Sequence, residues 1–182
     1  MEGVFRPSTR LKGLKGFKAF EEKFKETKEN VGIACFSDSR RNQMMWSHYA
    51  GNHSGICIGF KTTDLVNGLP DSCSLVRLAY DDRRPRLSSK VDIDRGAAVM
   101  AFSQKKLGWA YEREWRVLAV KSPTEPAGTI VPIDTECVTH VYFGFQIKQI
   151  HRVMLLKALD DTGIKISDMV VSSSGLTAKR IE

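Results

Sequence analysis

The sequence lacks the patterns that identify a membrane span, a zinc ribbon or the common nucleotide-binding loops. No apolar run approaches the roughly 20 residues that a membrane-spanning helix needs, and the first residues contain no apolar signal segment. The four cysteines include no C-x-x-C pair, which argues against a zinc ribbon or a redox motif. The motifs G-x-x-x-x-G-K-S/T, G-x-G-x-x-G and G-x-S-x-G do not occur, so kinases, Rossmann dehydrogenases and α/β-hydrolases have no support. We therefore expect a cytoplasmic protein without a membrane partner, or one that is injected or released by a route that leaves no signal in the sequence.

Composition and charge are those of an ordinary globular chain with a basic excess. The 182 residues are 42% hydrophobic and 27% charged, which suits one domain with a core of normal size. The net charge of +7 favours approach to polyanions without identifying one, and nucleic acid is the partner that it leaves open. The excess positive charge lies in two groups of basic residues, which lack interleaved aromatic residues, so we expect a solvated basic face. The first group is Arg6, Arg10, Lys12, Lys15 and Lys18, and the second is Arg77, Arg83, Arg84, Arg86 and Lys90.

Hydrophobic periodicity predicts helices and strands in irregular alternation. Helices are predicted over 11–29, about 40–50, about 94–107 and 146–160. Strands are predicted over 31–36, 55–60, 74–80, 112–120, 129–133, 139–143, 164–166 and 169–171, and 61–70 is predicted to be turn-rich. The pattern indicates an α+β fold with a mixed or mostly antiparallel sheet and three to four packed helices. We expect a single domain over 1–182, with a basic amphipathic segment over 1–30 and the core over 31–182.

Several side-chain positions follow from these elements. Three phenylalanines share one face of the first helix, and five apolar residues are predicted to face inward on the last: Phe17, Phe20 and Phe24, then Ile147, Ile150, Val153, Met154 and Leu156. Asp38 or Ser39 is expected to cap the second helix. Gly55 and Gly59 indicate that another group closely approaches one face of their strand. Cys35 and Cys57 lie in apolar runs and are predicted to be buried. With Cys73 and Cys137, they are expected to be free thiols without a catalytic role.

Two short segments carry most of the chemistry, 44–50 and 109–116, and all three tryptophans lie in them. Their tryptophan, tyrosine, histidine and carboxylate groups need hydrogen-bond partners, which either a substrate pocket or a buried structural network supplies. In the first segment we predict Trp46, His48 and Tyr49 to contact a ligand and the methionine pair to join the core. His48 and His53 are five residues apart, so they do not share one side of a helix, and no metal site is predicted.

The second segment is the stronger candidate for an active site. On a strand over 112–120, Glu112, Glu114 and Arg116 would project from one face at steps of roughly 7 Å. This row is either a salt-bridged, solvated sheet face or a cleft in which one glutamate ionises and acts on substrate while Arg116 orients the neighbouring glutamate. The flanking aromatic residues favour a pocket, and Lys105 with Lys106 adds positive charge for a phosphate-bearing ligand. The predicted catalytic residues are Glu114 and Glu112, and the predicted binding residues here are Trp109, Tyr111, Arg116 and Lys106.

Four segments together resemble a known family in order and spacing. They are Cys35-Phe36-Ser37, Met45-Trp46-Ser47-His48-Tyr49-Ala50, Gly55-Ile56-Cys57-Ile58-Gly59-Phe60 and Lys106-x-x-Trp109-x-x-Glu112-x-Glu114-Trp115-Arg116. This set resembles the bacterial domain-of-unknown-function family 2971 (DUF2971), from about Val31 to the C-terminus.

The family pattern is in turn distantly similar to ADP-ribosyltransferases of the DNA-modifying toxin kind. Those proteins bind NAD in a cleft of a split, two-sheet fold, and a glutamate on a later strand polarises the nicotinamide ribose. The similarity implies NAD as substrate and Glu114 or Glu112 as that glutamate. The chain departs from the family before Val31, where the usual Tyr-Lys-Tyr-Arg-like strand and Asn-Asp-Pro-Phe turn are absent. We therefore expect an N-terminally shortened relative, a basic segment that substitutes for the opening, or different chemistry.

Three functions remain as alternatives. The first is an NAD-dependent ADP-ribosyltransferase-like or NAD-glycohydrolase-like enzyme, as in a toxin or phage-defence effector. The second is a nuclease or nucleic-acid-modifying protein, which the net charge together with His48, Glu112 and Glu114 suggests. The third is a non-catalytic binding or regulatory protein, which the missing opening motif suggests.

Overall fold

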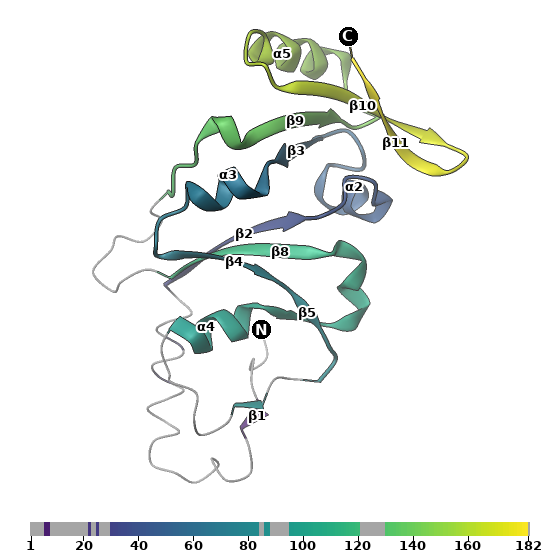
Figure 1. Cartoon of the computed structure of the whole chain (residues 1–182). Helices are drawn as coiled ribbons and strands as arrows, with labels where there is room; N and C mark the ends of the chain where they lie inside the picture. Colours follow the sequence, from purple (N-terminus) through teal and green to yellow (C-terminus); the bar gives the residue numbers. More distant parts are fainter. Residues whose placement is uncertain are drawn as a thin grey trace. The chain divides into compact units, whose positions relative to one another are not determined.

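The chain forms two compact units in the computed structural model, which describes residues 6–7, 22, 25, 30–83, 86–87, 95–120 and 130–181. Unit 1 comprises residues 1–38 and 69–131, and unit 2 comprises 39–68 and 132–182. Helices occur together with antiparallel and mixed sheets, so the predicted α+β class is confirmed (Figure 1). The phenylalanines of the predicted first helix and most of the two basic groups lie outside the described residues.

An antiparallel sheet of three strands forms the centre of unit 1, in the order β2-β8-β4. Its strands are β2 (Val31–Ser37), β8 (Glu114–Val120) and β4 (Cys73–Arg77). The middle strand carries the buried Val117 and Leu118. Cys35 on β2 lies opposite Arg116 on β8, and Ser37 lies opposite Glu114. This register brings the polar ends of β2 and β8 together.

Shorter elements of unit 1 lie around this sheet. They are β1 (Arg6–Pro7), β5 (Ala79–Tyr80), β6 (Arg86–Leu87), α4 (Arg95–Phe102), β7 (Gln104–Lys105) and the 3-10 helix η1 (Leu107–Glu112). β5 pairs with β7 in parallel, and β1 pairs with β6. The prediction of a single strand over 74–80 was wrong, because the buried Leu78 separates β4 from β5. The N–H of Leu78 donates to the carbonyl of Glu114 at 3.1 Å.

A mixed sheet of four strands forms the centre of unit 2, in the order β11-β10-β9-β3. Its strands are β3 (Ile56–Phe60), β9 (Val138–Phe143), β10 (Lys165–Ser172) and β11 (Gly175–Arg180). β9 and β10 are parallel, while the other two pairs are antiparallel. The core of the unit contains Trp46, Tyr142, Met169 and Leu176. The two short strands predicted over 164–166 and 169–171 form the one strand β10, and β11 was not predicted.

The helices of unit 2 differ from the predictions at several points. They are α2 (Gln43–Tyr49), α3 (Thr62–Asn67), α5 (Gln149–Leu159) and the 3-10 helix η2 (Thr135–Cys137). Asn42 caps α2, not Asp38 or Ser39, because its side chain accepts hydrogen bonds from the N–H groups of Met44 and Met45. The segment predicted to be turn-rich contains α3, and residues 130–133 form no strand.

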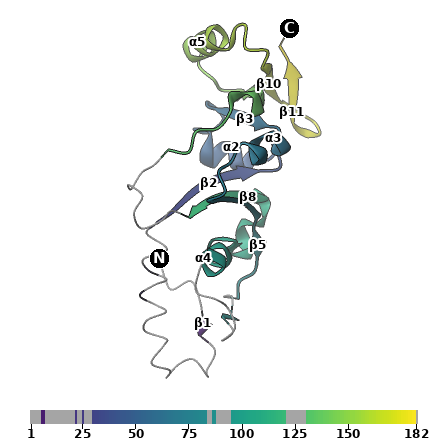
Figure 2. The same cartoon turned by 60° about the vertical axis from the view of Figure 1, so that its left-hand side comes forward.

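Helix α5 lies beside β10 in both views (Figures 1 and 2). Its side chains were predicted to be inward, but Ile150, Val153 and Met154 are exposed and no residue of α5 is buried. Arg152 attaches the helix to the sheet through a paired contact with both carboxylate oxygens of Asp168. The half-buried residues of α5 are Arg152, Leu155, Leu156 and Leu159, so apolar side chains occur on its covered side as well as on its exposed side.

The remaining side-chain predictions were only partly correct. All four cysteines are free, but Cys35 is exposed rather than buried and Cys57 is half-buried. Met44, which was assigned to the core, is exposed as well. No helix within the described ranges combines the length and the apolar character that crossing a membrane requires.

Candidate functional site

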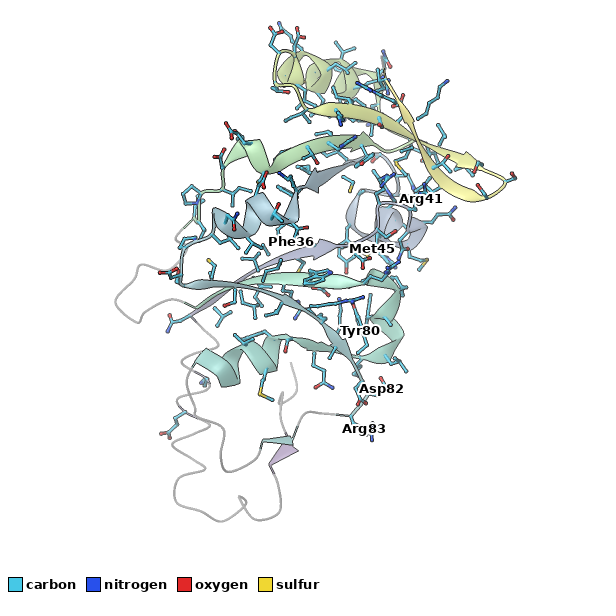
Figure 3. All side chains as sticks on the ribbon, viewed as in Figure 1. Phe36, Arg41, Met45, Tyr80, Asp82 and Arg83 are labelled. Carbon is cyan, nitrogen blue, oxygen red and sulfur yellow. The ribbon has the colours of Figure 1, made fainter. Side chains whose placement is uncertain are left out.

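The predicted carboxylates lie on either side of a sharp backbone turn in unit 1. Glu112 ends η1, Glu114 begins β8, and Arg113 between them has a φ of 49°, in the left-handed region. The turn ends the helical segment and starts the strand, so Glu112 does not lie on the strand face where the alternation placed it. Asp82, labelled in Figure 3, accepts a hydrogen bond from the N–H of Leu107 at 3.2 Å and fixes the start of η1.

Both carboxylates converge on one ammonium group. Lys105 Nζ donates to Glu112 Oε2 and lies 2.9 Å from Glu114 Oε2. Arg116 Nε donates to Glu114 Oε1 at 2.7 Å, and its Nη1 donates to the carbonyl of Phe102 at 2.7 Å. Glu112 is 2% and Glu114 3% exposed. Two buried carboxyl groups and two half-buried cations therefore form a cluster whose formal charges balance, and we call these four residues the carboxylate cluster.

Main-chain contacts hold the same two glutamates in place. The N–H of Glu114 donates to the hydroxyl of Tyr80 at 2.8 Å, and the hydroxyl of Ser37 donates to the carbonyl of Glu112 at 2.7 Å. Tyr80 lies on β5 and is labelled in Figure 3. Strands β2 and β5 thus position the backbone on both sides of Arg113, which gives the carboxylate cluster a fixed geometry.

The surroundings of Glu114 keep it ionised. Burial alone would raise its pKa, but hydrogen bonds from Arg116, Cys35 and Lys105 outweigh burial and lower the pKa from 4.5 to about 2. Burial likewise opposes the charge on Lys105, and the two glutamates reverse this effect and raise its pKa. At neutral pH the cluster consequently holds a charged carboxylate and a charged ammonium.

Acidification is expected to remove the stability that ionised Glu114 provides. The pKa of Glu114 is lower in the folded protein than in the unfolded chain. The contribution of the ionised carboxylate to the free energy of unfolding is therefore complete above about pH 4.5 and is lost as the pH falls toward 2. The difference between 4.5 and about 2 corresponds to roughly 3 kcal/mol. Urea unfolding of the wild type and of Glu114→Gln is measured from pH 7 down to pH 2.5. The difference between their free energies of unfolding should shrink by about this amount over that range, because only the wild type loses the contribution of the carboxylate. A difference that is independent of pH would contradict the expectation, and the exposed Glu136→Gln serves as the control.

Cys35 is part of this site although the sequence marked it only as a buried apolar residue. It lies opposite Arg116 in the β2–β8 register, and its thiol is hydrogen-bonded to Glu114. Desolvation, followed by the hydrogen bond and the negative charge of Glu114, raises the pKa of the thiol. The protonated thiol is therefore a third hydrogen-bond donor to the Glu114 carboxylate.

An aromatic surface adjoins the carboxylate cluster. Trp109 is 41% exposed, and its ring centroid lies 6.0 Å from that of the half-buried Tyr111. Lys105 Nζ lies 5.1 Å from the Trp109 centroid, within the range of a cation–π contact. Lys106 beside it is exposed. Four predicted binding residues thus belong to this region, with Trp109 and Lys106 at the surface and Arg116 inside.

Comparison with known proteins finds one family that matches part of the chain. The model of the DUF2971 family, described as a protein of unknown function, matches residues 45–117. Over these residues the chain is similar to the DUF2971 family. No curated protein and no solved structure matches the chain. The family segment includes both Trp46 and the carboxylate cluster, and the resemblance predicted from the sequence is confirmed over it.

The first predicted site lies in the unit 2 part of the DUF2971 segment, whereas the carboxylate cluster lies in unit 1. Trp46 is buried in the core, where its Nε1 donates to the carbonyl of Arg40 at 2.7 Å. His48 and Tyr49 are exposed, with their rings edge to face at 6.2 Å. The three predicted ligand-binding residues of α2 therefore do not converge on one point within unit 2.

The buried histidine of the DUF2971 segment is His53, which the sequence did not single out. Its Nε2 lies 3.3 Å from Ser47 Oγ, and its ring stacks on Trp46 and contacts Phe145. Its Nδ1 is buried without a hydrogen-bond partner. His53 also has a φ of 65° and follows Asn52 at 52°, so two non-glycine residues take the left-handed conformation in succession. Asparagine and histidine take a positive φ more often than most other non-glycine residues, so the Asn52-His53 pair was the sequence signal that could have located this loop.

The described residues contain no group of three or more His, Cys, Asp or Glu side chains arranged to hold a metal ion. In the carboxylate cluster the oxygens face an ammonium and a guanidinium instead. The chemistry that this arrangement offers is a fixed, ionised carboxylate next to an exposed aromatic ring.

Proposed function

We propose that this chain is an NAD-consuming enzyme, ADP-ribosyltransferase-like or NAD-glycohydrolase-like, in which Glu114 is the catalytic carboxylate. One observation carries the proposal: Glu114 is 3% exposed, ionised and held by three side-chain donors. The adjoining surface of Trp109 and Tyr111 supports it, because exposed aromatic rings stack on the planar rings of a dinucleotide.

The reaction requires a negative charge at a fixed point. When the bond between the nicotinamide nitrogen and the ribose C1′ breaks, the electron pair leaves with nicotinamide and positive charge develops on the ribose. A preorganised carboxylate stabilises that charge without having to reorganise. Water, or a nucleophile on a target molecule, then bonds to C1′ and loses a proton. In this proposal Glu114 faces the ribose, while the exposed Lys106 attracts the phosphates.

The proposal assigns a movable position to Lys105. Its ammonium lies between the two carboxylates and the ring of Trp109. A ribose reaches Glu114 only after this side chain turns away, and the flexible four-carbon stem of lysine permits such a movement. Glu112 then keeps the ammonium inside the site while Glu114 is released.

Nicotinamide release is the decisive measurement. The full chain is incubated with NAD, alone and with DNA, RNA or cell lysate, and nicotinamide is followed by chromatography. Glu114→Gln should lower the rate by about 100-fold or more, the loss expected for a preorganised electrostatic group. The exposed Glu136→Gln is the matched control and should keep the wild-type rate. The unfolding curve of each variant establishes that the loss is not caused by unfolding.

Two results would change the proposal in different ways. No nicotinamide from the wild type under any of these conditions would overturn NAD chemistry for this chain. Full activity of Glu114→Gln would move the catalytic role to Glu112, which Glu112→Gln then tests. A polymer that gains mass during the reaction would identify a transferase and its target, whereas free ADP-ribose would identify a glycohydrolase.

A non-catalytic binding or regulatory protein is the second candidate, and the closed carboxylate cluster favours it. Both carboxylates are buried, and each contacts a cation of opposite charge, as in a structural network. Here Glu114→Gln would lower stability in a protein that consumes no NAD. A rise in melting temperature with added NAD, without release of nicotinamide, would identify binding without turnover.

A further inference from the structure

One face of the unit 2 sheet gathers cations from separate segments of the chain. His140 on β9 lies opposite Lys165 on β10, and Tyr142 lies opposite Ser167, which in turn lies opposite Arg180 on β11. Residues paired across neighbouring strands project from the same face. Lys165 and Arg180 therefore share a face with His140 and Tyr142, and both cations are exposed.

The rings of His140 and Tyr142 on this face form a stacked pair, in which Tyr142 belongs to the buried core of unit 2 and His140 is half-buried. The centroids of His140 and Tyr142 are 5.2 Å apart, with 6° between the ring planes. Arg40 Cζ lies 5.1 Å from the Tyr142 centroid, so a third cation extends over the same rings. The carbonyl of Arg40 accepts the hydrogen bond from the buried Trp46, which fixes its backbone to the core. Arg40 therefore projects from an anchored position.

Gly59 leaves room for the ring pair. Gly59 lies on β3, opposite His140 on β9. A Cβ at position 59 would come within 3.2 Å of His140 Cβ and 3.4 Å of Tyr142 Cε2. The close approach that the glycine pattern predicted at this position is thus that of the His140 and Tyr142 side chains. A larger residue would displace the rings around which the cations lie.

The electrostatic effect of the three cations converges on His140. Burial lowers the pKa of this imidazole, and the charges of Lys165, Arg40 and Arg180 lower it further. On the opposite face of the sheet the arrangement differs, because Arg152 is paired with Asp168. Within the described ranges no carboxylate forms an ion pair with Lys165, Arg40 or Arg180. The exposed border of this face, where β10 begins and β11 ends, therefore carries positive charge that no ion pair of the described residues neutralises.

We propose that the exposed border of this face binds the phosphate groups of a nucleotide or of a nucleic-acid strand, with Arg40, Lys165 and Arg180 as the donors. Guanidinium and ammonium groups form charge-assisted hydrogen bonds with phosphate oxygens, and such contacts dominate nucleic-acid affinity. The three side chains come from the segment before α2, from β10 and from β11, so the fold assembles the site from distant parts of the chain. The proposal is independent of NAD chemistry in unit 1.

The test measures binding of a fluorescently labelled 20-nucleotide DNA single strand to the full chain by anisotropy. The triple variant Arg40→Gln/Lys165→Gln/Arg180→Gln should bind at least about tenfold more weakly at low salt. Its slope of log affinity against log salt should become shallower by about 2, because each lost phosphate contact removes about 0.7. The control triple variant Lys148→Gln/Lys157→Gln/Lys179→Gln removes the same charge from exposed lysines of unit 2 and should bind within about threefold of the wild type.

The outcomes separate a site from general attraction. Equal weakening in both triple variants would overturn the proposal, and so would a wild type that fails to bind the strand at low salt. Competition then distinguishes the sources of phosphate: displacement by millimolar AMP indicates a mononucleotide site, and displacement only by unlabelled strand indicates a polymer. Glu114→Gln should bind the strand like the wild type, so loss of NAD chemistry and loss of this site are separately observable.

Discussion

Replacing Lys105 with methionine is expected to lower the free energy of unfolding by about 3–5 kcal/mol, one of the two largest effects that we predict. The substitution keeps the length and apolar stem of the side chain but removes the ammonium that Glu112 and Glu114 share. Both carboxylates are nearly inaccessible to water, so their charge would remain buried without this partner. Urea unfolding at pH 7 measures the loss.

Lys106→Met is the matched control for this prediction. Lys106 is exposed, so its replacement should change the free energy of unfolding by no more than about 0.5 kcal/mol. Adding Glu112→Gln to Lys105→Met should recover part of the stability, since one buried charge is removed. A Lys105→Met protein as stable as Lys106→Met would show that the cluster does not depend on the shared ammonium.

Gly144→Ala is expected to destabilise unit 2 by about 3 kcal/mol, the upper end of the usual cost of overpacking. A Cβ at Gly144 would lie 2.0 Å from the carbonyl oxygen of His53 and 2.6 Å from its carbonyl carbon. These are backbone atoms, and the same carbonyl accepts the N–H of Gln146 at 3.0 Å. Relief of the clash would separate the loop before β3 from the turn after β9. Thermal unfolding with calorimetry measures the effect.

Gly68→Ala provides the comparison within the same unit. Gly68 follows α3, and a Cβ there would meet only ordinary contacts at 3.5 Å and 3.8 Å. Its free energy of unfolding should stay within about 1 kcal/mol of the wild type. A melting temperature for Gly144→Ala that equals that of Gly68→Ala would mean that the loop moves away without cost.

Sequence patterns located the residues of the carboxylate cluster but did not predict the backbone turn and the long-range contacts that arrange them. Strand alternation correctly placed Glu114 and Arg116 on one face of β8, where they form an ion pair. Glu112 reaches the cluster through the left-handed turn at Arg113, and arginine carries no sequence signal for such a turn. The hydrogen bond from Glu114 to Tyr80 spans 34 residues, so it depends on tertiary packing that no local pattern contains.

The fold predictions failed where packing, not periodicity, decides the outcome. The apolar residues of α5 follow the helical period, yet Ile150 and Met154 are exposed, whereas Leu155 and Leu159 are half-buried on the side where Arg152 pairs with Asp168. Strand β11 contains Leu176 as its only large apolar residue, so its extended structure depends on pairing with β10. By contrast, β3 and β9 have strong apolar patterns and were predicted within one residue at each end.

The pairing of β3 with β9 also determines when unit 2 can fold during synthesis. Thr139 on β9 donates to the carbonyl of Gly59 on β3, a contact between residues 80 positions apart. At about 5–20 residues per second, the ribosome needs about 4–16 s to make the intervening chain. Throughout that interval the apolar segment Ile56–Phe60 has been synthesised without its sheet partner. A newly made chain therefore exposes an unpaired β-strand for seconds, the period in which a holding chaperone would bind it.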